Sequence, residues 1–561
     1  MKVRRTRPLA GSILSAALLA LLASGCEKSP PPGAQPREDS EPEAPRAGSP
    51  VLPRELSGAA PSAKPAASAA PAPEAPWTGP WLAITDSAAG VYSDQSFDRN
   101  KKIGFIRSGG KVPVEAQPEK QKNCTGGWYK VRSGGYVCGN YGTTDMAHPE
   151  VKFATAQPNL KEVLPYPYAR NAKHGTPLYK SVPSREQMDQ YEPYLKEEKE
   201  KKEREKAAKA EADRPVALAD KVEPALPIAA ADAGTTLLPP PAGASADPQP
   251  DKPWWQQENI KDRLHEVKLE ELEHDSDDIL AKRMVTGFYV AVDKTFRWNG
   301  RLWYKTTKGL VTPADRFWQT SGSSFKGVEL DGTTMKLPIG WVYGGNKSAG
   351  TYEIDVDGKT IKNAKSIDKF VAIPLTGKSI EFQGKQYVEL SDGTYMKKSQ
   401  LRITEPGPPP QGLAENERYV DVDLSSQTLV AYEGSRPVYA TLISSGKHSK
   451  DKDKDHSTPT GEWRIREKHV TTTMDGDGTA AGDLPYSIED VPFVQYYHRS
   501  YALHAAFWHS NFGVQMSHGC VNLAPLDAKW VFFFTGPGLP EGFHGVWSND
   551  AAPGTRVVVH D

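Results

Sequence analysis

A stretch near the C-terminus, Tyr501 to Leu523, holds the residues best suited to chemistry. It reads YALHAAFWHSNFGVQMSHGCVNL and contains one cysteine, Cys520, with His518 and His504 before it. A cysteine attacks a carbonyl group as its thiolate, and an unperturbed thiol with a pKa of about 8.5 is only slightly ionised at neutral pH. A nearby imidazole can take up the thiol proton. The pattern therefore indicates a nucleophile and a general base.

Two other interpretations stay open for these residue types. A single cysteine among aromatic residues is often a small, buried apolar side chain. His504, His509, His518 and Cys520 are also possible zinc ligands, although the stretch lacks the CxxC and HExxH spacings. Gly519 suits a tight turn that lets a substrate backbone approach closely.

His504 and the run Ser517-His518-Gly519-Cys520-Val521-Asn522 resemble the signature of the L,D-transpeptidase catalytic domain family (YkuD type). That family carries a His, a gap of about a dozen residues, Ser/Thr-His-Gly-Cys, a hydrophobic residue, and Asn or Arg. Thr458-Pro459-Thr460-Gly461 also matches the family's Thr-Pro-x-Gly turn before an aromatic residue.

The resemblance implies roles for the residues around the cysteine. Cys520 would be the nucleophile, and His504 the general base and then the general acid. The backbone carbonyl of Ala505, where the family usually has Gly or Ser, would orient the imidazole. Backbone N–H groups of His518, Gly519 and Cys520 would form the oxyanion hole.

Asn522 and Ser517 of the motif would position the substrate. His518 would also be a positioning residue rather than the base. For Ser517, a local structural hydrogen bond is an equal alternative. No metal or diffusible cofactor is implied by the resemblance.

The resemblance also implies a substrate. The donor would be a peptidoglycan tetrapeptide stem, cut between its third residue and D-Ala through a thioester on Cys520. The acceptor would be the side-chain amine of a neighbouring stem, which gives a cross-link. Water as acceptor would make the protein an L,D-carboxypeptidase, and an amine on a protein would attach that protein to the wall. The sequence does not choose among these acceptors.

A function of another class remains an alternative, namely a catalytically inactive lipoprotein that binds peptidoglycan. Nucleic acid is not an expected partner, because the formal net charge of the chain is only −1.

The N-terminus predicts export to a bacterial envelope. Basic residues precede a short apolar run, Gly11 to Ala23, so residues 1–25 are expected to be a signal peptide. Leu22-Ala23-Ser24-Gly25-Cys26 resembles a lipoprotein box, with a lipid on Cys26 as the membrane anchor. An ordinary secretory signal is the alternative. Glu27 stands where Asp would favour retention in the inner membrane, so the outer membrane, facing the periplasm, is preferred.

The chain has four cysteines. If Cys26 is lipidated and Cys520 is the nucleophile, Cys124 and Cys138 remain as a disulfide pair, which an oxidising envelope permits. A loop of this size would contribute about 3 kcal/mol in the chain-entropy model. Two unpaired buried thiols are the alternative.

Composition divides the rest of the chain, and the expected class is mainly β and multidomain. Residues 26–76 are rich in Pro and Ala and predict a tether. Residues 77–193 predict a module of short strands with a C-terminal extension, where GGWYKV and GGYVCGNY resemble a bacterial SH3-like barrel. Residues 194–214 predict a solvated charged helix, and residues 215–276 predict a linker.

The second half predicts more β structure. Residues 277–405 are expected to form one compact SH3-like module or two intertwined small barrels. Residues 417–561 are expected to be the L,D-transpeptidase domain, with a short helix after Cys520 that begins at Pro525. The insertion at 447–457 predicts a surface loop and that at 471–484 a flap. Aspartates in the flap only loosely resemble a calcium loop, in the wrong order for an EF-hand.

Overall fold

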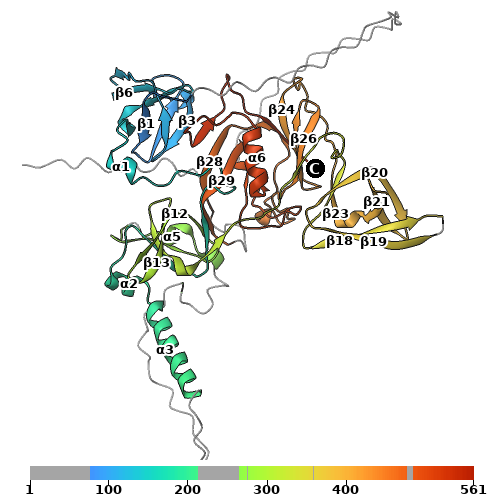
Figure 1. The fold of residues 1–561 in the computed structure, drawn as a ribbon, viewed down its shortest axis with the longest axis horizontal. Coiled ribbons are helices and arrows are strands. Elements are labelled where there is room, and N and C mark those ends of the chain that lie inside the picture. The colour runs from blue at the N-terminus through green and yellow to red at the C-terminus, as the bar shows by residue number, and fades with distance from the viewer. Residues whose placement is uncertain (1–75, 213–254, 256–263, 275, 358, 477–483) are drawn as a thin grey trace, which may run out of the picture. The chain divides into compact units, whose positions relative to one another are not determined.

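The structure is a computed structural model of the chain, and it describes residues 76–212, 255, 264–274, 276–357, 359–476 and 484–561 (Figure 1). The expected signal peptide, the lipidation of Cys26 and nearly all of the tether lie outside the described residues, as does most of the linker. The described chain is mainly β and arranged in several sheets, so the predicted fold class is confirmed.

Contacts divide the chain into two units, residues 1–80 and 81–561. In the first unit only residues 76–80 are described, and there the indole N–H of Trp77 donates to the carbonyl of Pro80 at 3.0 Å. All elements named below belong to the second unit. No helix in the described ranges is long and apolar enough to cross a membrane.

The N-terminal module, residues 81–143, consists of short strands around one apolar core. Alternate residues point inward, as in Val91 of one strand and Ile106 of the next, both fully buried. Strand β1 pairs with β4 and β8, β2 pairs with β3 and β7, and β6 pairs with β5 and β7. The strands are β1 (Trp81–Ile84), β2 (Ala88–Tyr92), β3 (Lys102–Arg107), β4 (Lys111–Pro113), β5 (Glu119–Gln121), β6 (Cys124–Lys130), β7 (Tyr136–Cys138) and β8 (Gly142–Thr143).

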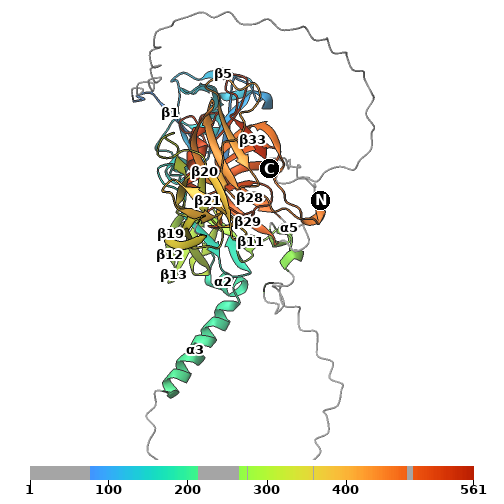
Figure 2. The same ribbon diagram turned by 90° about the vertical axis from the view of Figure 1, so that its right-hand side faces the viewer.

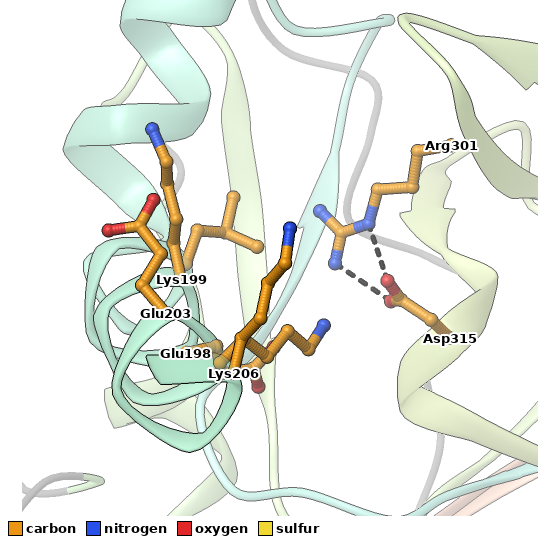
Figure 3. A pocket seen from close by; sticks show the side chains of 8 residues that line it. Glu198, Lys199, Glu203, Lys206, Arg301 and Asp315 are labelled. Atoms are coloured by element: carbon orange, nitrogen blue, oxygen red, sulfur yellow. Dashed lines mark hydrogen bonds and ion pairs between the residues drawn. The ribbon is translucent and has the colours of Figure 1, made fainter. Parts of the chain in front are cut away.

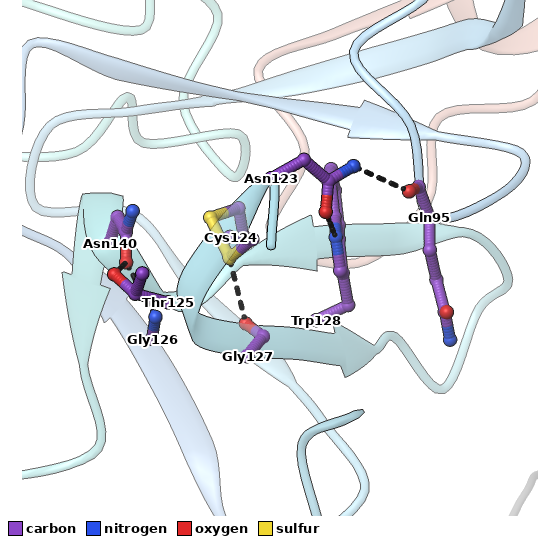
Figure 4. Close-up of a disulfide and its surroundings, with 9 residues drawn as sticks. Gln95, Asn123, Cys124, Thr125, Gly126, Gly127, Trp128 and Asn140 are labelled. Atoms are coloured by element: carbon purple, nitrogen blue, oxygen red, sulfur yellow. Dashed lines mark hydrogen bonds between the residues drawn. A yellow bond between two sulfur atoms is a disulfide. The ribbon is translucent and has the colours of Figure 1, made fainter. Parts of the chain in front are cut away.

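Cys124 and Cys138 form a disulfide between β6 and β7 (Figure 4). The bond packs against Trp128, which is also buried and whose indole N–H donates to Asn123 at 3.1 Å. The Asn140 side chain accepts the N–H of Gly126 at 2.6 Å. The disulfide therefore links β6 covalently to β7, beside the register pair of Trp128 and Cys138.

The middle module combines two stretches that lie far apart in the sequence. Its early strands, β9 (Tyr168–Asn171) and β10 (Thr176–Tyr179), pair with strands that follow residue 279. The later strands are β11 (Leu280–Met284), β12 (Tyr289–Trp298), β13 (Arg301–Thr306), β14 (Val311–Pro313) and β15 (Phe317–Thr320). The structure thus differs from the expected boundary at residue 193, because β9 and β10 bury their side chains in this core and not in the N-terminal module.

Short helices accompany the strands of the middle module. α5 (Leu269–Leu272) lies in the expected linker, yet its Leu272 is buried in the module core together with Leu264 and Val267. Because these apolar residues belong to the module core, the linker ends before Leu264 and not at residue 276. The other short helix here is α2 (Arg185–Tyr191), and α1 (Pro149–Lys152) precedes β9.

The charged helix expected for residues 194–214 is α3 (Tyr194–Ala212), a single straight helix in Figure 2. Lys201 and Glu205 form an i,i+4 ion pair at 3.8 Å. One side of α3 borders a pocket of about 390 Å³, whose far wall holds Arg301 and Asp315, joined by two hydrogen bonds of 2.8 and 2.7 Å (Figure 3). Charges of both signs line this pocket.

The inserted module, residues 339–404, is a separate seven-stranded sheet, drawn in yellow in Figure 1. The expected module at 277–405 is therefore divided into two parts that do not share a sheet. The strand order is β19-β18-β22-β21-β20-β17-β23. The strands are β17 (Ile339–Val342), β18 (Ser348–Asp355), β19 (Thr360–Asp368), β20 (Ala372–Phe382), β21 (Lys385–Leu390), β22 (Tyr395–Lys397) and β23 (Leu401–Thr404). An SH3-like character of any module stays a prediction.

The C-terminal domain begins at about residue 417 and has two sets of strands around one core, and one short strand from an earlier part of the chain joins the first set. The first set is a six-stranded sheet of order β16-β26-β25-β24-β33-β27. Its strands are β16 (Val328–Glu329), β24 (Arg418–Asp423), β25 (Thr428–Glu433), β26 (Arg436–Leu442), β27 (Gly461–Arg464) and β33 (Arg556–His560). The second set is β28 (Glu467–Gly476), β29 (Tyr486–His498), β30 (Tyr501–Ala505), β31 (Val521–Leu523) and β32 (Gly545–Trp547).

Helix α6 (Pro525–Phe534) follows β31, as expected for a helix that begins at Pro525. Its Val531 and Phe532 are fully buried in the core between the two sets of strands. Asp527 is also buried, and it accepts hydrogen bonds from Tyr439 at 2.6 Å and from the N–H of Gly327 at 2.7 Å. These bonds fix the helix against the first sheet.

A buried carboxylate, Asp490 of β29, joins three parts of the chain. Arg107 of the N-terminal module donates to its two oxygens at 2.8 and 3.2 Å. Thr307 of the middle module and Thr471 of β28 also donate to this carboxylate, and the Tyr168 hydroxyl donates to the Asp490 carbonyl at 2.5 Å. Burial alone would raise the pKa of Asp490, but the charge of Arg107 and the hydrogen bonds from Thr307 and Arg107 hold it below its usual value.

Replacing Asp490 with Asn should destabilise the protein by about 3 kcal/mol, because Arg107 would keep its charge in a buried site without a counter-ion. Differential scanning calorimetry of the wild type and Asp490→Asn measures this effect. Glu115→Gln is the matched control, since it removes an exposed ion pair with Lys130, and it should leave the melting temperature unchanged. Equal melting temperatures for all three proteins would contradict the role given to Asp490.

Candidate active site

Cys520 lies at the start of a buried parallel strand pair. β30 and β31 run in parallel with Leu503 opposite Val521 and His504 opposite Asn522, and Cys520 directly precedes β31. The thiol is partly exposed, and its Sγ lies 3.7 Å from the carbonyl oxygen of Ser500. The strand pair thus brings Cys520 to the edge of the sheet that carries His504.

The turn before Cys520 depends on Gly519, whose φ is +118°. A Cβ atom added here would lie 2.6 Å from the Tyr501 ring, so only glycine fits. Ser517 closes the turn, because its hydroxyl accepts the N–H of Gly519 at 3.1 Å and donates to the carbonyl of Cys520. Because the N–H of Gly519 already donates to the Ser517 hydroxyl, it does not point toward a substrate oxyanion. The expected oxyanion donors are thereby reduced to the N–H groups of His518 and Cys520.

Thr458, from the Thr-Pro-x-Gly turn, holds the same loop from the other side. It is buried, and its hydroxyl accepts the N–H of Gly446 at 2.9 Å while it donates to the carbonyl of Gly519 at 2.8 Å. One side chain therefore fixes the distance between the end of β26 and the turn that carries Cys520.

His504 is buried, with 2% of its surface exposed, and its Nδ1 lies 3.2 Å from the carbonyl oxygen of Ala505. A carbonyl can only accept, so Nδ1 carries the proton and Nε2 keeps its lone pair. Burial lowers the pKa of His504 to about 4, although the Ala505 contact opposes this shift. The imidazole is therefore neutral at pH 7 and oriented as a proton acceptor.

Asn522 and His509 form a second polar pair beside His504. Asn522 is 3% exposed, and its amide lies 3.1 Å from Nε2 of His509. The sequence pattern marked His509 only as a possible zinc ligand and did not place it against Asn522. The sequence feature that could have indicated this contact is that His509 lies between His504 and Asn522 in the same short stretch.

His518 is exposed, and its ring packs on Tyr486 and on His456, at centroid distances of 5.2 and 4.8 Å. His456 belongs to the 447–457 insertion, whose Lys447 N–H donates to the carbonyl of Ser517 at 3.1 Å. The insertion is therefore attached to the loop that carries Cys520. The centre of the expected flap, residues 477–483, lies outside the described residues.

No group of three His, Cys, Asp or Glu side chains in the described ranges is arranged to hold a metal ion. The zinc interpretation therefore has no set of ligands there. Two of the three aspartates in the loosely calcium-like stretch, Asp477 and Asp483, lie outside the described residues.

Together, the fold and the site define a mainly β protein with a buried histidine on one strand and a cysteine directly before the neighbouring strand, an arrangement suited to acyl transfer. Residues 417–559 match the family model of the L,D-transpeptidase catalytic domain, YkuD. The chain thus carries a C-terminal YkuD-like domain, as the motif around Cys520 predicted.

Several solved structures are similar to part of the chain. An L,D-transpeptidase from Xylanimonas cellulosilytica is 22% identical, with 28% of this chain and 64% of that chain covered and a TM-score of 0.19. One from Stackebrandtia nassauensis is 23% identical, with 26% and 57% covered and a TM-score of 0.18. This chain spans less than two thirds of either. The catalytic domain of the E. faecium enzyme is 24% identical, with 26% and 98% covered and a TM-score of 0.19. No curated protein matches the chain.

Thr458→Val should both destabilise the domain and misplace Cys520. Valine has nearly the same shape, but it leaves the Gly446 N–H and the Gly519 carbonyl unsatisfied, which costs about 2–4 kcal/mol in total. The thermal midpoint and the rate of alkylation of Cys520 by iodoacetamide test this. Thr460→Val changes an exposed threonine two residues away and serves as the control. A Thr458→Val protein that behaves like that control would remove Thr458 from the site.

Proposed function

We propose that the C-terminal domain is a peptidoglycan L,D-transpeptidase that acts through a thioester on Cys520. The observation that supports this most is the orientation of His504, whose Nδ1 is held by the Ala505 carbonyl so that Nε2 is left to accept a proton. The match of residues 417–559 to the family supplies the substrate class.

The reaction has two halves. In the first, Nε2 of His504 takes the proton of Cys520 while the sulfur attacks the carbonyl between the third stem residue and D-Ala. The tetrahedral intermediate collapses to the thioester, and His504 returns the proton to the amine of the leaving D-Ala. In the second, an acceptor amine attacks the thioester and gives its proton to His504, which restores the thiol. Two stems are then linked.

Other residues support these steps. N–H groups of His518 and Cys520 stabilise the oxyanion, and Asn522 contacts the donor stem. Ser517 shapes the loop through the two hydrogen bonds that support this structural role. Water in place of the amine gives L,D-carboxypeptidase activity from the same thioester.

The cellular setting is part of the proposal. A signal peptide and a lipid on Cys26 place the protein in the bacterial envelope, facing the periplasm. The outer membrane is the preferred anchor, and the tether lets the folded part reach the wall. An inactive lipoprotein that binds peptidoglycan through its small modules is the second candidate, favoured by the number of β modules outside the C-terminal domain.

Mass spectrometry of muropeptides separates these functions. The protein without residues 1–76 should convert disaccharide-tetrapeptides into dimers with loss of D-Ala, because the thioester on Cys520 is captured by an amine. Cys520→Ala should form neither product, while its fold stays intact by circular dichroism. A tripeptide without dimer would indicate a carboxypeptidase instead. If neither protein gives product and a carbapenem leaves Cys520 unmodified, the binding function would be favoured.

The pH dependence of acylation should reflect the lowered pKa of His504. Because burial lowers this pKa from 6.5 to about 4, the base stays neutral as the pH falls through 6.5. The rate of Cys520 acylation by a carbapenem should therefore lose its His504-dependent part only near pH 4. A loss centred near pH 6.5 would show that the imidazole is not desolvated.

Acid unfolding must be followed alongside these rates. The folded-state pKa values of His504, His509 and His544 are all lowered to about 4, so the unfolded state binds protons first. The stability that these three residues contribute is therefore complete above about pH 6.5 and is lost as the pH falls to about 4. Circular dichroism at each pH separates this loss from protonation of the base.

A further inference from the structure

The contact between His509 and Asn522 leaves one end of a buried amide without a partner. The Asn522 amide faces Nε2 of His509 at 3.1 Å, and the backbone N–H of Asn511 donates to Nδ1 of the same ring at 3.3 Å. The other end of the Asn522 amide is buried and forms no hydrogen bond. Buried polar atoms are rarely left in this state unless a ligand or water satisfies them.

The two contacts of His509 determine where its proton lies. Nδ1 accepts the N–H of Asn511, so it carries no proton, and a neutral imidazole then has its proton on Nε2. Nε2–H can only donate. The doubly protonated ring is disfavoured, because burial, with a smaller contribution from His504, lowers the pKa of His509 to about 4.

The orientation of the Asn522 amide follows from this tautomer. Nε2–H of His509 needs an acceptor, so the atom of Asn522 that faces it must be the side-chain oxygen. The amide N–H₂ then occupies the buried end that has no partner. The oxygen and the nitrogen of a side-chain amide have nearly the same size and shape. Their hydrogen-bond partners therefore decide which atom occupies which position.

The free end lies on the face of the sheet that carries the general base. Asn522 and His504 are register partners in the parallel pair β30–β31, so their side chains project to the same face. A peptide carbonyl bound for attack by Cys520 would bring an oxygen acceptor to this face. A carbonyl oxygen is what an N–H₂ group requires.

We propose that His509 is a positioning residue, which locks the Asn522 amide with its N–H₂ toward a carbonyl oxygen of the bound donor stem. His509 itself touches neither the substrate nor the sulfur. Its Nε2–H holds the Asn522 oxygen, and this prevents the amide from rotating to present an oxygen that would repel the carbonyl. The inference rests on the proposed function for its substrate, but the tautomer and the amide orientation are properties of the resting protein.

The resting protein tests the tautomer without any substrate. Nitrogen-15 NMR of the protein labelled in its histidines, with the His509 signal assigned from His509→Gln, should show a proton on Nε2 and a lone pair on Nδ1. A proton on Nδ1 would overturn the proposal, because Asn522 would then have to face His509 with its nitrogen. This result does not depend on whether the protein makes cross-links.

Asn522→Asp tests which end of the amide acts on substrate. The carboxylate still accepts from Nε2–H of His509, but it has no N–H₂ for the donor stem, so kcat/KM for the tetrapeptide should fall at least about tenfold. Asn511→Asp is the matched control, because it adds the same charge to an exposed side chain nearby and leaves the Asn511 backbone N–H in place. Wild-type activity in Asn522→Asp would show that the free end is an oxygen, which would overturn the proposal.

Two variants of His509 separate positioning from a structural role. His509→Leu should lower kcat about tenfold with little change in the rate at which iodoacetamide alkylates Cys520. His509→Gln can again donate to the Asn522 oxygen, and it should recover most of the lost kcat. Equal losses of kcat and of alkylation in both variants would indicate a disturbed fold and contradict the proposal. If wild-type protein gives no product while Nε2 carries the proton, the proposed function fails and the assigned orientation stands.

Discussion

The parallel pairing of β30 with β31 is the interaction on which the site depends. His504 lies on one strand and Asn522 on the other, at matched positions, and Cys520 is the last residue before the second strand. The intervening loop contributes His509 and the turn at Gly519. Any slip of this pairing by one residue would move His504 and Asn522 to opposite faces. The relative positions of Cys520, His504 and Asn522 are therefore set by backbone hydrogen bonds between the two strands.

Strand β29 connects this strand pair to the other modules of the chain. It pairs with β30 along Gln495 to His498, and farther back it carries Asp490, which binds Arg107 and Thr307 from two other modules. Asp490 has a positive φ of 50°, and the pairing of β28 with β29 shifts register beside it, between Thr472 and Met474. The modules are thus fixed to the strand that leads directly into the one holding His504. One strand, β29, therefore both pairs with the strand that holds His504 and carries the residue to which the modules attach.

The sequence predicted the features that are local or carried by a motif. These include the helix that begins at Pro525, the charged helix α3 and the YkuD-like domain around Cys520. It did not predict that β9 and β10 would pair with strands beyond residue 279, because alternation of residues identifies a strand but not its partner. The sequence also predicted the N–H of Gly519 as an oxyanion donor. The structure shows instead that this N–H donates to the Ser517 hydroxyl, a contact that exists only in the folded loop.

Burial also determines when charge appears in this site. His504 and His509 lie close enough for His504 to lower the pKa of His509 further, and both rings are neutral at pH 7. A resting thiolate–imidazolium pair would require a charged ring in this desolvated position, which burial disfavours. In the proposed reaction, proton transfer from Cys520 to His504 is therefore coupled to the attack on the carbonyl, when the oxyanion supplies a compensating charge. Under that proposal, both imidazoles stay neutral until the attack on a substrate carbonyl creates a charge for them to stabilise.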